Sequence, residues 1–188
     1  MPELQITAVS TKSELEQFIT FPWQVYKSNP HWVPPLISER KRFLDPEHNP
    51  FFEHAKATFY LARRNGQVVG TIGAFSNQLY NQVHGENAGF FGFYEVLDEP
   101  ETARALLATA EAWGRQAGHD RLLGPMQYST NAELGLLIDG FDDPPRILMT
   151  YNPPRYRGYL EAAGYLKAMD LLAYSVNVRE LHDGMPEK

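Results

Sequence analysis

The sequence of 188 residues predicts an α/β protein with a mixed central sheet and helices on both faces of that sheet. Three observations predict this class. Two strand-like runs flank Asn65-Gly66, a pair that tolerates the positive φ angles of a tight β-hairpin turn. An amphipathic helix is expected from about Pro100 to Gln116. Strands and helices then alternate to the end of the chain, which is typical of a sheet covered by helices.

Before the hairpin, the sequence predicts one strand and two helical segments. Residues 4–9, LQITAV, alternate well enough for a short strand. Thr11 and Glu14 have the spacing of a capping box, so a helix is expected to begin after Thr11 and to break at Pro22. A further helix is expected over about 35–43.

After the hairpin, residues 78–87 are expected to form a connection with a helical turn, and residues 88–96 to form a strand. Gly89 and Gly92 lie inside that strand and predict a bulge or a close approach by another group. The helix that follows begins with proline and is expected to stop at Gly118.

The last third of the sequence predicts three short strands with two helices between them. The strands are expected at 120–126, 145–151 and 166–178, and the helices, the first of them short, at 129–141 and 152–165. The pattern as a whole predicts one domain over residues 1–178 and a polar tail over 179–188.

Composition excludes several classes of function. The net charge of −6 disfavours nucleic-acid binding and attraction to an anionic membrane surface. The absence of cysteine excludes disulfides, a thiol nucleophile and a thiolate metal site, and the six histidines lack metal-ligand spacing. The sequence shows neither a signal-peptide pattern nor the roughly 20 apolar residues of a membrane span. We therefore expect a cytoplasmic protein without a metal.

The predicted element order resembles the general N-acetyltransferase (GNAT) superfamily, in which a strand leads into the acetyl-CoA helix. The segment 159–165, YLEAAGY, resembles a helix–strand junction of that superfamily that often reads LYEKLGF. Several longer phrases resemble the first half of a larger family of GNAT-like bacterial proteins, whose chain usually continues for about another such module. They are FPWQVYKSNPHWVPPL, NPFFEHA, GFFGFYE, GPMQYSTNAELGLLIDGF and MTYNPPRY.

The resemblance implies an acyl-CoA-dependent N-acyltransferase that moves an acetyl or similar group to a small-molecule amine. Acetyl-CoA would lie beside Tyr94 and Val96, with its pyrophosphate at the start of the following helix. Residues 96–104, VLDEPETAR, lack the usual glycine pattern, and three of their side chains, Asp98, Glu99 and Glu101, are acidic. Either these acids only cap the helix, or a rebuilt site uses the N–H groups of Thr102, Ala103 and Arg104, with the Arg104 side chain as counter-charge.

The resemblance also implies candidate catalytic and substrate residues. Glu95 is the candidate general base, or else an ordinary acid at a strand end. Leu160 occupies the usual position of the tyrosine that protonates the leaving thiolate, so Tyr156, one turn earlier, is the candidate acid. Asn152 is either a coenzyme contact or a helix cap. Two further residues, Tyr128 and Asn131, lie near the substrate or belong to a polar turn.

A second interpretation keeps the GNAT-like fold but assigns no catalytic activity to it. In it the chain is a non-catalytic GNAT-like module that packs against a second module or binds a small ligand. Association as a homodimer is a related possibility. The sequence does not identify the acceptor amine.

Overall fold

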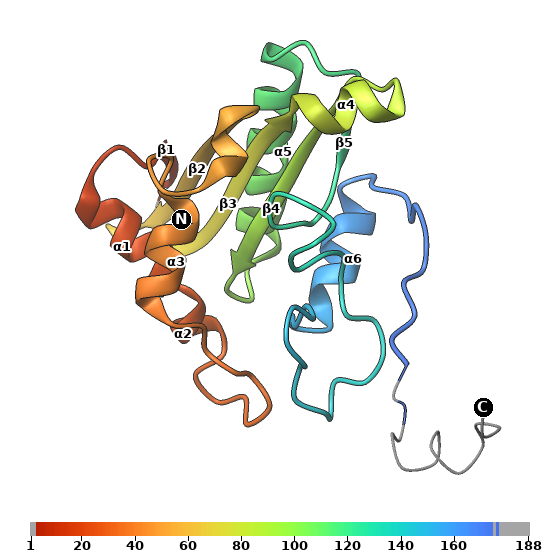
Figure 1. Cartoon of the computed structure of the whole chain (residues 1–188). Coiled ribbons are helices and arrows are strands. Elements are labelled where there is room, and N and C mark those ends of the chain that lie inside the picture. Colours follow the sequence, from red (N-terminus) through yellow and green to blue (C-terminus); the bar gives the residue numbers. More distant parts are fainter. Residues whose placement is uncertain (1–2, 175, 177–188) are drawn as a thin grey trace, which may run out of the picture.

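A single five-stranded sheet forms the centre of the protein (Figure 1). The computed structural model describes residues 3–174 and 176. The strands lie in the order β1-β2-β3-β4-β5, and their bounds are Leu4–Ala8, Ala55–Arg64, Gln67–Asn77, Ala88–Val96 and Arg121–Leu123. The first four strands pair antiparallel, whereas β5 pairs parallel to β4. The sheet is therefore mixed, as the sequence predicted.

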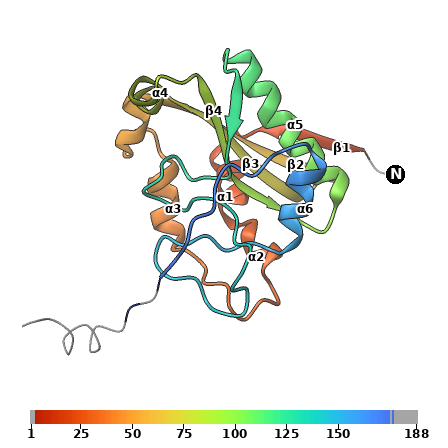
Figure 2. The same cartoon turned by 90° about the vertical axis from the view of Figure 1, so that its right-hand side faces the viewer.

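Helices cover both faces of the sheet (Figure 2). One face packs against α5 and α6, and the other against α1, α3 and the 3-10 helix η1. The bounds are Lys12–Thr20 for α1, Pro22–Val25 for α2, Ile37–Leu44 for α3, Pro50–Glu53 for η1, Gln78–His84 for α4, Pro100–Gln116 for α5 and Arg155–Ala162 for α6. Among the described residues, no helix is long and apolar enough to cross a membrane.

Local sequence signals explain where the elements in the first two thirds of the chain begin and turn. The Thr11 hydroxyl accepts the Glu14 N–H at 3.2 Å, and the Glu14 carboxylate accepts the Thr11 N–H at 3.0 Å, which confirms the capping box. Asn65 and Gly66 have φ angles of 51° and 77°, which confirms the hairpin turn between β2 and β3.

The predicted close approach at Gly92 is confirmed and marks the point where β4 leaves its neighbour. A β-carbon on Gly92 would lie 1.6 Å from the carbonyl oxygen of Met126. β5 pairs only with residues 88–90 of β4. Beyond Gly92, therefore, the end of β4 up to Val96 lies outside the pairing with β5, and the Tyr156 side chain of α6 contacts it there.

The predicted elements in the last third are partly wrong. Residues 145–151 and 166–174 form no strand, and residues 129–141 form no helix. Residues 129–141 instead form an irregular loop. An isolated antiparallel β-bridge joins Leu134 in this loop to Met126 before it. The predicted strand 145–151 contains Leu148 at φ 63°, which is incompatible with extended backbone. The end of the third predicted strand and the tail 179–188 lie outside the described residues.

Candidate active site

The carboxylate of Glu95 lies between two tyrosine hydroxyls at the end of β4. The Tyr156 hydroxyl, from α6, lies 2.8 Å from Glu95 Oε2. The Tyr26 hydroxyl, from the residue after α2, lies 3.0 Å from each carboxylate oxygen. Three elements distant in sequence thus meet at one half-buried acid, which is the arrangement expected of a positioned acid or base.

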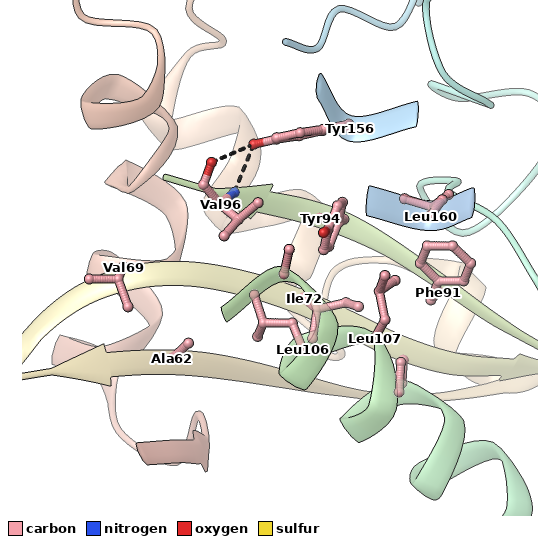
Figure 3. Packing of buried hydrophobic residues seen from close by; sticks show 13 residues of the cluster. Ala62, Val69, Ile72, Phe91, Tyr94, Val96, Leu106, Leu107, Tyr156 and Leu160 are labelled. Atoms are coloured by element: carbon pink, nitrogen blue, oxygen red, sulfur yellow. Dashed lines mark hydrogen bonds between the residues drawn. The ribbon is translucent and has the colours of Figure 1, made fainter. Parts of the chain in front are cut away.

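Tyr156 also binds the main chain of β4 at Val96, where β4 still pairs with β3 but no longer with β5 (Figure 3). Its hydroxyl accepts the Val96 N–H at 2.7 Å and lies 3.1 Å from the Val96 carbonyl oxygen. Its ring packs edge-on against Tyr94, with 5.2 Å between the ring centroids. Tyr156 is only 1% exposed, so it fills the space beside the end of β4.

Burial dominates the electrostatics of this site. Desolvation raises the pKa of Glu95 to about 8, although the hydrogen bonds from Tyr156 and Tyr26 partly offset the effect. The nearby charge of Glu133 raises the Glu95 pKa further, and that of Arg155 lowers it. Burial likewise holds the pKa of each tyrosine well above its usual range. A carboxyl with this pKa changes its protonation state close to neutral pH, which suits a general base.

The remaining acids near the start of α5 are held by arginine and tyrosine side chains. Arg64 forms ion pairs with Glu99 at 3.3 Å and with Glu101 at 3.0 Å. The Asp98 carboxylate accepts a hydrogen bond from the Tyr159 hydroxyl at 2.7 Å. The acids thus serve mainly as structural partners, and arginine offsets part of their negative field.

The expected free amides at this helix start are mostly engaged. Because Glu99 is the N-cap, its carbonyl accepts the Ala103 N–H at 3.0 Å. Arg104 follows within the helix, where the regular pattern uses its N–H, and Thr102 is fully buried. The Ala103 and Arg104 amides are therefore used within the helix, and a diphosphate contact at the Thr102 amide stays a prediction. The Arg104 side chain is exposed and lines a shallow surface hollow beside β1, together with Arg64.

The Asn152 side chain hydrogen-bonds within the loop before α6 and does not cap that helix. Its amide oxygen accepts the Leu137 N–H at 2.7 Å, and its amide nitrogen donates to the Pro153 carbonyl at 3.0 Å. The N-cap of α6 is Pro154, without a side-chain cap bond, so the cap interpretation is wrong.

The two predicted substrate residues have different surroundings. Tyr128 is 2% exposed and stacks on Phe51 with 4.3 Å between the ring centroids. Its hydroxyl has no hydrogen-bond partner among the described residues. Asn131 is exposed in the following loop, where its N–H donates to the Ser129 hydroxyl at 3.2 Å. The structure thus places Tyr128 in the aromatic core beside η1 and gives Asn131 a turn contact.

The sequence interpretation missed Tyr26 and its surroundings. Tyr26 stacks on Trp32, with 4.8 Å between the ring centroids, and its hydroxyl lies 3.1 Å from the Tyr151 carbonyl oxygen. The Tyr151 hydroxyl in turn contacts the Asn29 side chain at 3.0 Å. These residues lie in the phrases FPWQVYKSNPHW and MTYNPPRY, so an aromatic-rich pair of loops was the available signal. Within the described residues, no group of three acidic or histidine side chains could hold a metal ion.

Comparison with solved structures assigns the class of fold. The aminoglycoside N-acetyltransferase AAC(6′)-Iy, solved in complex with CoA, superposes on 94% of this chain and 96% of its own with a TM-score of 0.53 at 15% identity. A tandem GNAT protein from the clavulanic acid biosynthesis pathway superposes on 86% of this chain and 43% of its own with a TM-score of 0.57 at 19% identity. The chain therefore has the fold of the GNAT superfamily, as the resemblance implied.

Two curated relatives are more similar in sequence. Protein YghO of Escherichia coli is 39% identical over 163 residues, which cover 87% of this chain and 42% of YghO. The bacterial ceramide synthase of Caulobacter vibrioides is 40% identical over 176 residues, which cover 93% of this chain and 46% of that enzyme. The chain thus spans less than half the length of each of these relatives. No family model matches the sequence.

Proposed function

We propose that the chain supplies the catalytic base of an acyl-CoA-dependent N-acyltransferase. The observation that carries the proposal is the half-buried Glu95 carboxylate at the end of β4, held by Tyr26 and Tyr156. Its raised pKa, about 8, lets it accept a proton from an ammonium group near neutral pH. The GNAT fold supports acyl transfer to an amine as the class of reaction, with acetyl-CoA or another acyl-CoA as donor.

In the proposed reaction, Glu95 takes a proton from the acceptor ammonium, and the free amine nitrogen attacks the thioester carbonyl. A carbon–nitrogen bond forms, the carbon–sulfur bond breaks, and CoA leaves as a thiolate. Tyr156 can pass its hydroxyl proton to that thiolate and recover a proton from Glu95, because the two groups lie 2.8 Å apart. After the carbon–nitrogen bond has formed, the amide nitrogen loses its second proton to solvent. Of the two protons that leave the acceptor ammonium, one thus ends on the CoA thiol and the other in the water.

The acceptor is proposed from a relative and from the surroundings of Glu95. One relative is named a bacterial ceramide synthase, and a ceramide is an amide of a long-chain amino alcohol. The Tyr26–Trp32 stack lies beside the base, and the neighbouring Val33 and Leu36 are well exposed. An apolar rim of this kind suits an amine that carries an alkyl chain better than a polycationic one.

A second function, a GNAT-like module without acyl transfer of its own, is favoured by one specific observation. The Val96 N–H is already bonded to Tyr156, and the Ala103 N–H to Glu99, so neither is free for a thioester or a phosphate. The module would then bind a ligand or support a catalytic partner.

The two functions are separated by a coenzyme titration and an amine panel. Isothermal calorimetry with acetyl-CoA and with palmitoyl-CoA measures binding, and release of free CoA thiol measures turnover with short amines, a long-chain amino alcohol and an aminoglycoside. Micromolar binding with turnover of the amino alcohol supports the transferase. Absence of binding at millimolar coenzyme supports the module.

A further inference from the structure

The chain after α6 runs along the outside of the molecule (Figure 1). Its apolar side chains over residues 166–176 form an exposed strip. We call it the C-terminal apolar strip and define it as Leu166, Met169, Leu171, Leu172, Tyr174 and Val176. Each of these side chains is between 57% and 92% exposed. Single exposed apolar residues are normal on a protein surface, but six within eleven positions mark an interaction surface.

The strip is little covered by the described remainder of the chain, because each of its side chains is more than half exposed. It forms no helix or strand over residues 166–174, although its sequence predicts a strand. Two charged residues lie between its members in the sequence, and they form an ion pair with each other, Lys167 with Asp170 at 2.9 Å. These two charges cancel, so the strip presents an apolar surface without net charge. Such a surface matches the core of a protein–protein interface, from which unpaired charges are depleted.

The lengths of related proteins indicate what covers the strip. The chain matches only 42% of YghO and 46% of the Caulobacter ceramide synthase. The tandem GNAT protein, of which the chain covers 43%, has two modules by its own description. In each case more than half of a longer polypeptide lies outside the region that resembles this chain.

We propose that the C-terminal apolar strip is the docking surface for a second GNAT-like module of a longer polypeptide. The strip is buried in that assembly, and the segment that is irregular here gains an ordered partner. This proposal is independent of the reaction at Glu95, because it concerns a different surface and its test measures association.

The test uses the part of Escherichia coli YghO that this chain does not match. That part is co-expressed with the tagged 188-residue chain, and complexes are measured by size-exclusion chromatography with light scattering and by calorimetry. The double substitution Leu172→Asp with Tyr174→Asp disrupts the strip. The matched control is Leu79→Asp with Val83→Asp on α4, a separate element whose two apolar side chains are 53% and 71% exposed. Circular dichroism checks that both variants melt like the unchanged chain.

A one-to-one complex that weakens at least tenfold in the strip variant, and is unchanged in the α4 variant, supports the proposal. Absence of a complex, or equal weakening by both variants, overturns it. Two other outcomes assign the strip to a different partner and also overturn it. One is a homodimer of the chain that the strip variant abolishes. The other is binding of the chain to phosphatidylcholine vesicles that depends on the strip.

Discussion

The Tyr156 hydroxyl lies 2.8 Å from Glu95 Oε2 and 2.7 Å from the Val96 nitrogen, although 61 and 60 positions separate Tyr156 from these residues in the sequence. The Tyr156 side chain thus hydrogen-bonds to the candidate base, Glu95, and also accepts the N–H of the next residue, Val96. The relationship joins the two proposed functions, because the side chain that positions Glu95 also uses the Val96 N–H, which is then not available to a thioester. Substitutions at the two tyrosines therefore separate positioning from proton transfer.

Tyr156→Phe is expected to lower the activity at every pH. It removes the group that relays a proton to the thiolate, and loss of a general acid costs about 10²-fold or more. It also leaves the buried Val96 N–H without its partner, which destabilises the fold by about 1–3 kcal/mol. Turnover across pH 6.5–9.5 and urea unfolding measure the two effects. A variant that regains the full wild-type plateau at high pH would show that Tyr156 only positions Glu95.

Tyr26→Phe is expected to shift the pH dependence upward without lowering the plateau. Its hydrogen bond to Glu95 lowers the pKa of that carboxyl, so removing the bond raises the pKa. A base is active when deprotonated, and the rising limb of the pH–rate profile therefore moves to higher pH. The cost in stability is about 0.5–1.5 kcal/mol, because no main-chain donor is orphaned. An unshifted profile would remove Tyr26 from the site.

The acids at the start of α5 are expected to weaken coenzyme binding. The double substitution Glu99→Gln with Glu101→Gln removes two charges that would repel a diphosphate, together with the two ion pairs that these acids form with Arg64. Near a surface, such repulsions amount to about 1–2 kcal/mol, so acetyl-CoA affinity should rise about tenfold at low salt.

Glu111→Gln is the control for this pair, because Glu111 lies later on the same helix and pairs with Arg115. Calorimetry at low and high salt compares the variants. Equal affinity in the double variant and the control would mean that the phosphates bind elsewhere.

Gly92→Ala is expected to destabilise the fold by at least about 2 kcal/mol, because its β-carbon would overlap the Met126 carbonyl and core overpacking costs energies of this size. The control is Gly158→Ala in α6, where a β-carbon meets nothing within 4 Å. That change should stabilise the helix by about 0.5–1 kcal/mol. Thermal and urea unfolding measure both variants. Similar stability in the two would contradict the close approach of the loop to β4.

The parts of the fold that follow from the sequence are those governed by neighbouring residues. Asn65 and Gly66 dictate the turn by their own φ preferences, and Thr11 caps its helix three residues away. The start of α5 at Pro100 depends equally on local chemistry. Each of these features needs no contact from elsewhere in the chain.

The parts that sequence reasoning missed depend on distant contacts. The hydroxyl of Tyr26 and the carboxylate of Glu95 lie 69 positions apart, and nothing in the local pattern joins them. The strands expected at 145–151 and 166–178 carry suitable side chains, but a strand forms only where a neighbour completes its hydrogen bonds. The strand β5, Arg121–Leu123, is only three residues long, so within the described residues it has few main-chain groups with which another strand could pair.

The measurement that bears most directly on the role of Glu95 is the pH dependence of acyl transfer in the unchanged chain and in Glu95→Gln. With palmitoyl-CoA and a long-chain amino alcohol, kcat/KM of the unchanged chain should rise as the pH increases through about 8, because burial raises the pKa of Glu95 to that value. Glu95→Gln should lose about 10²-fold or more of this activity and show no such rise. A substituted chain with activity within twofold of the original, or an original profile that is flat from pH 6.5 to 9.5, would contradict the assignment of Glu95 as the base.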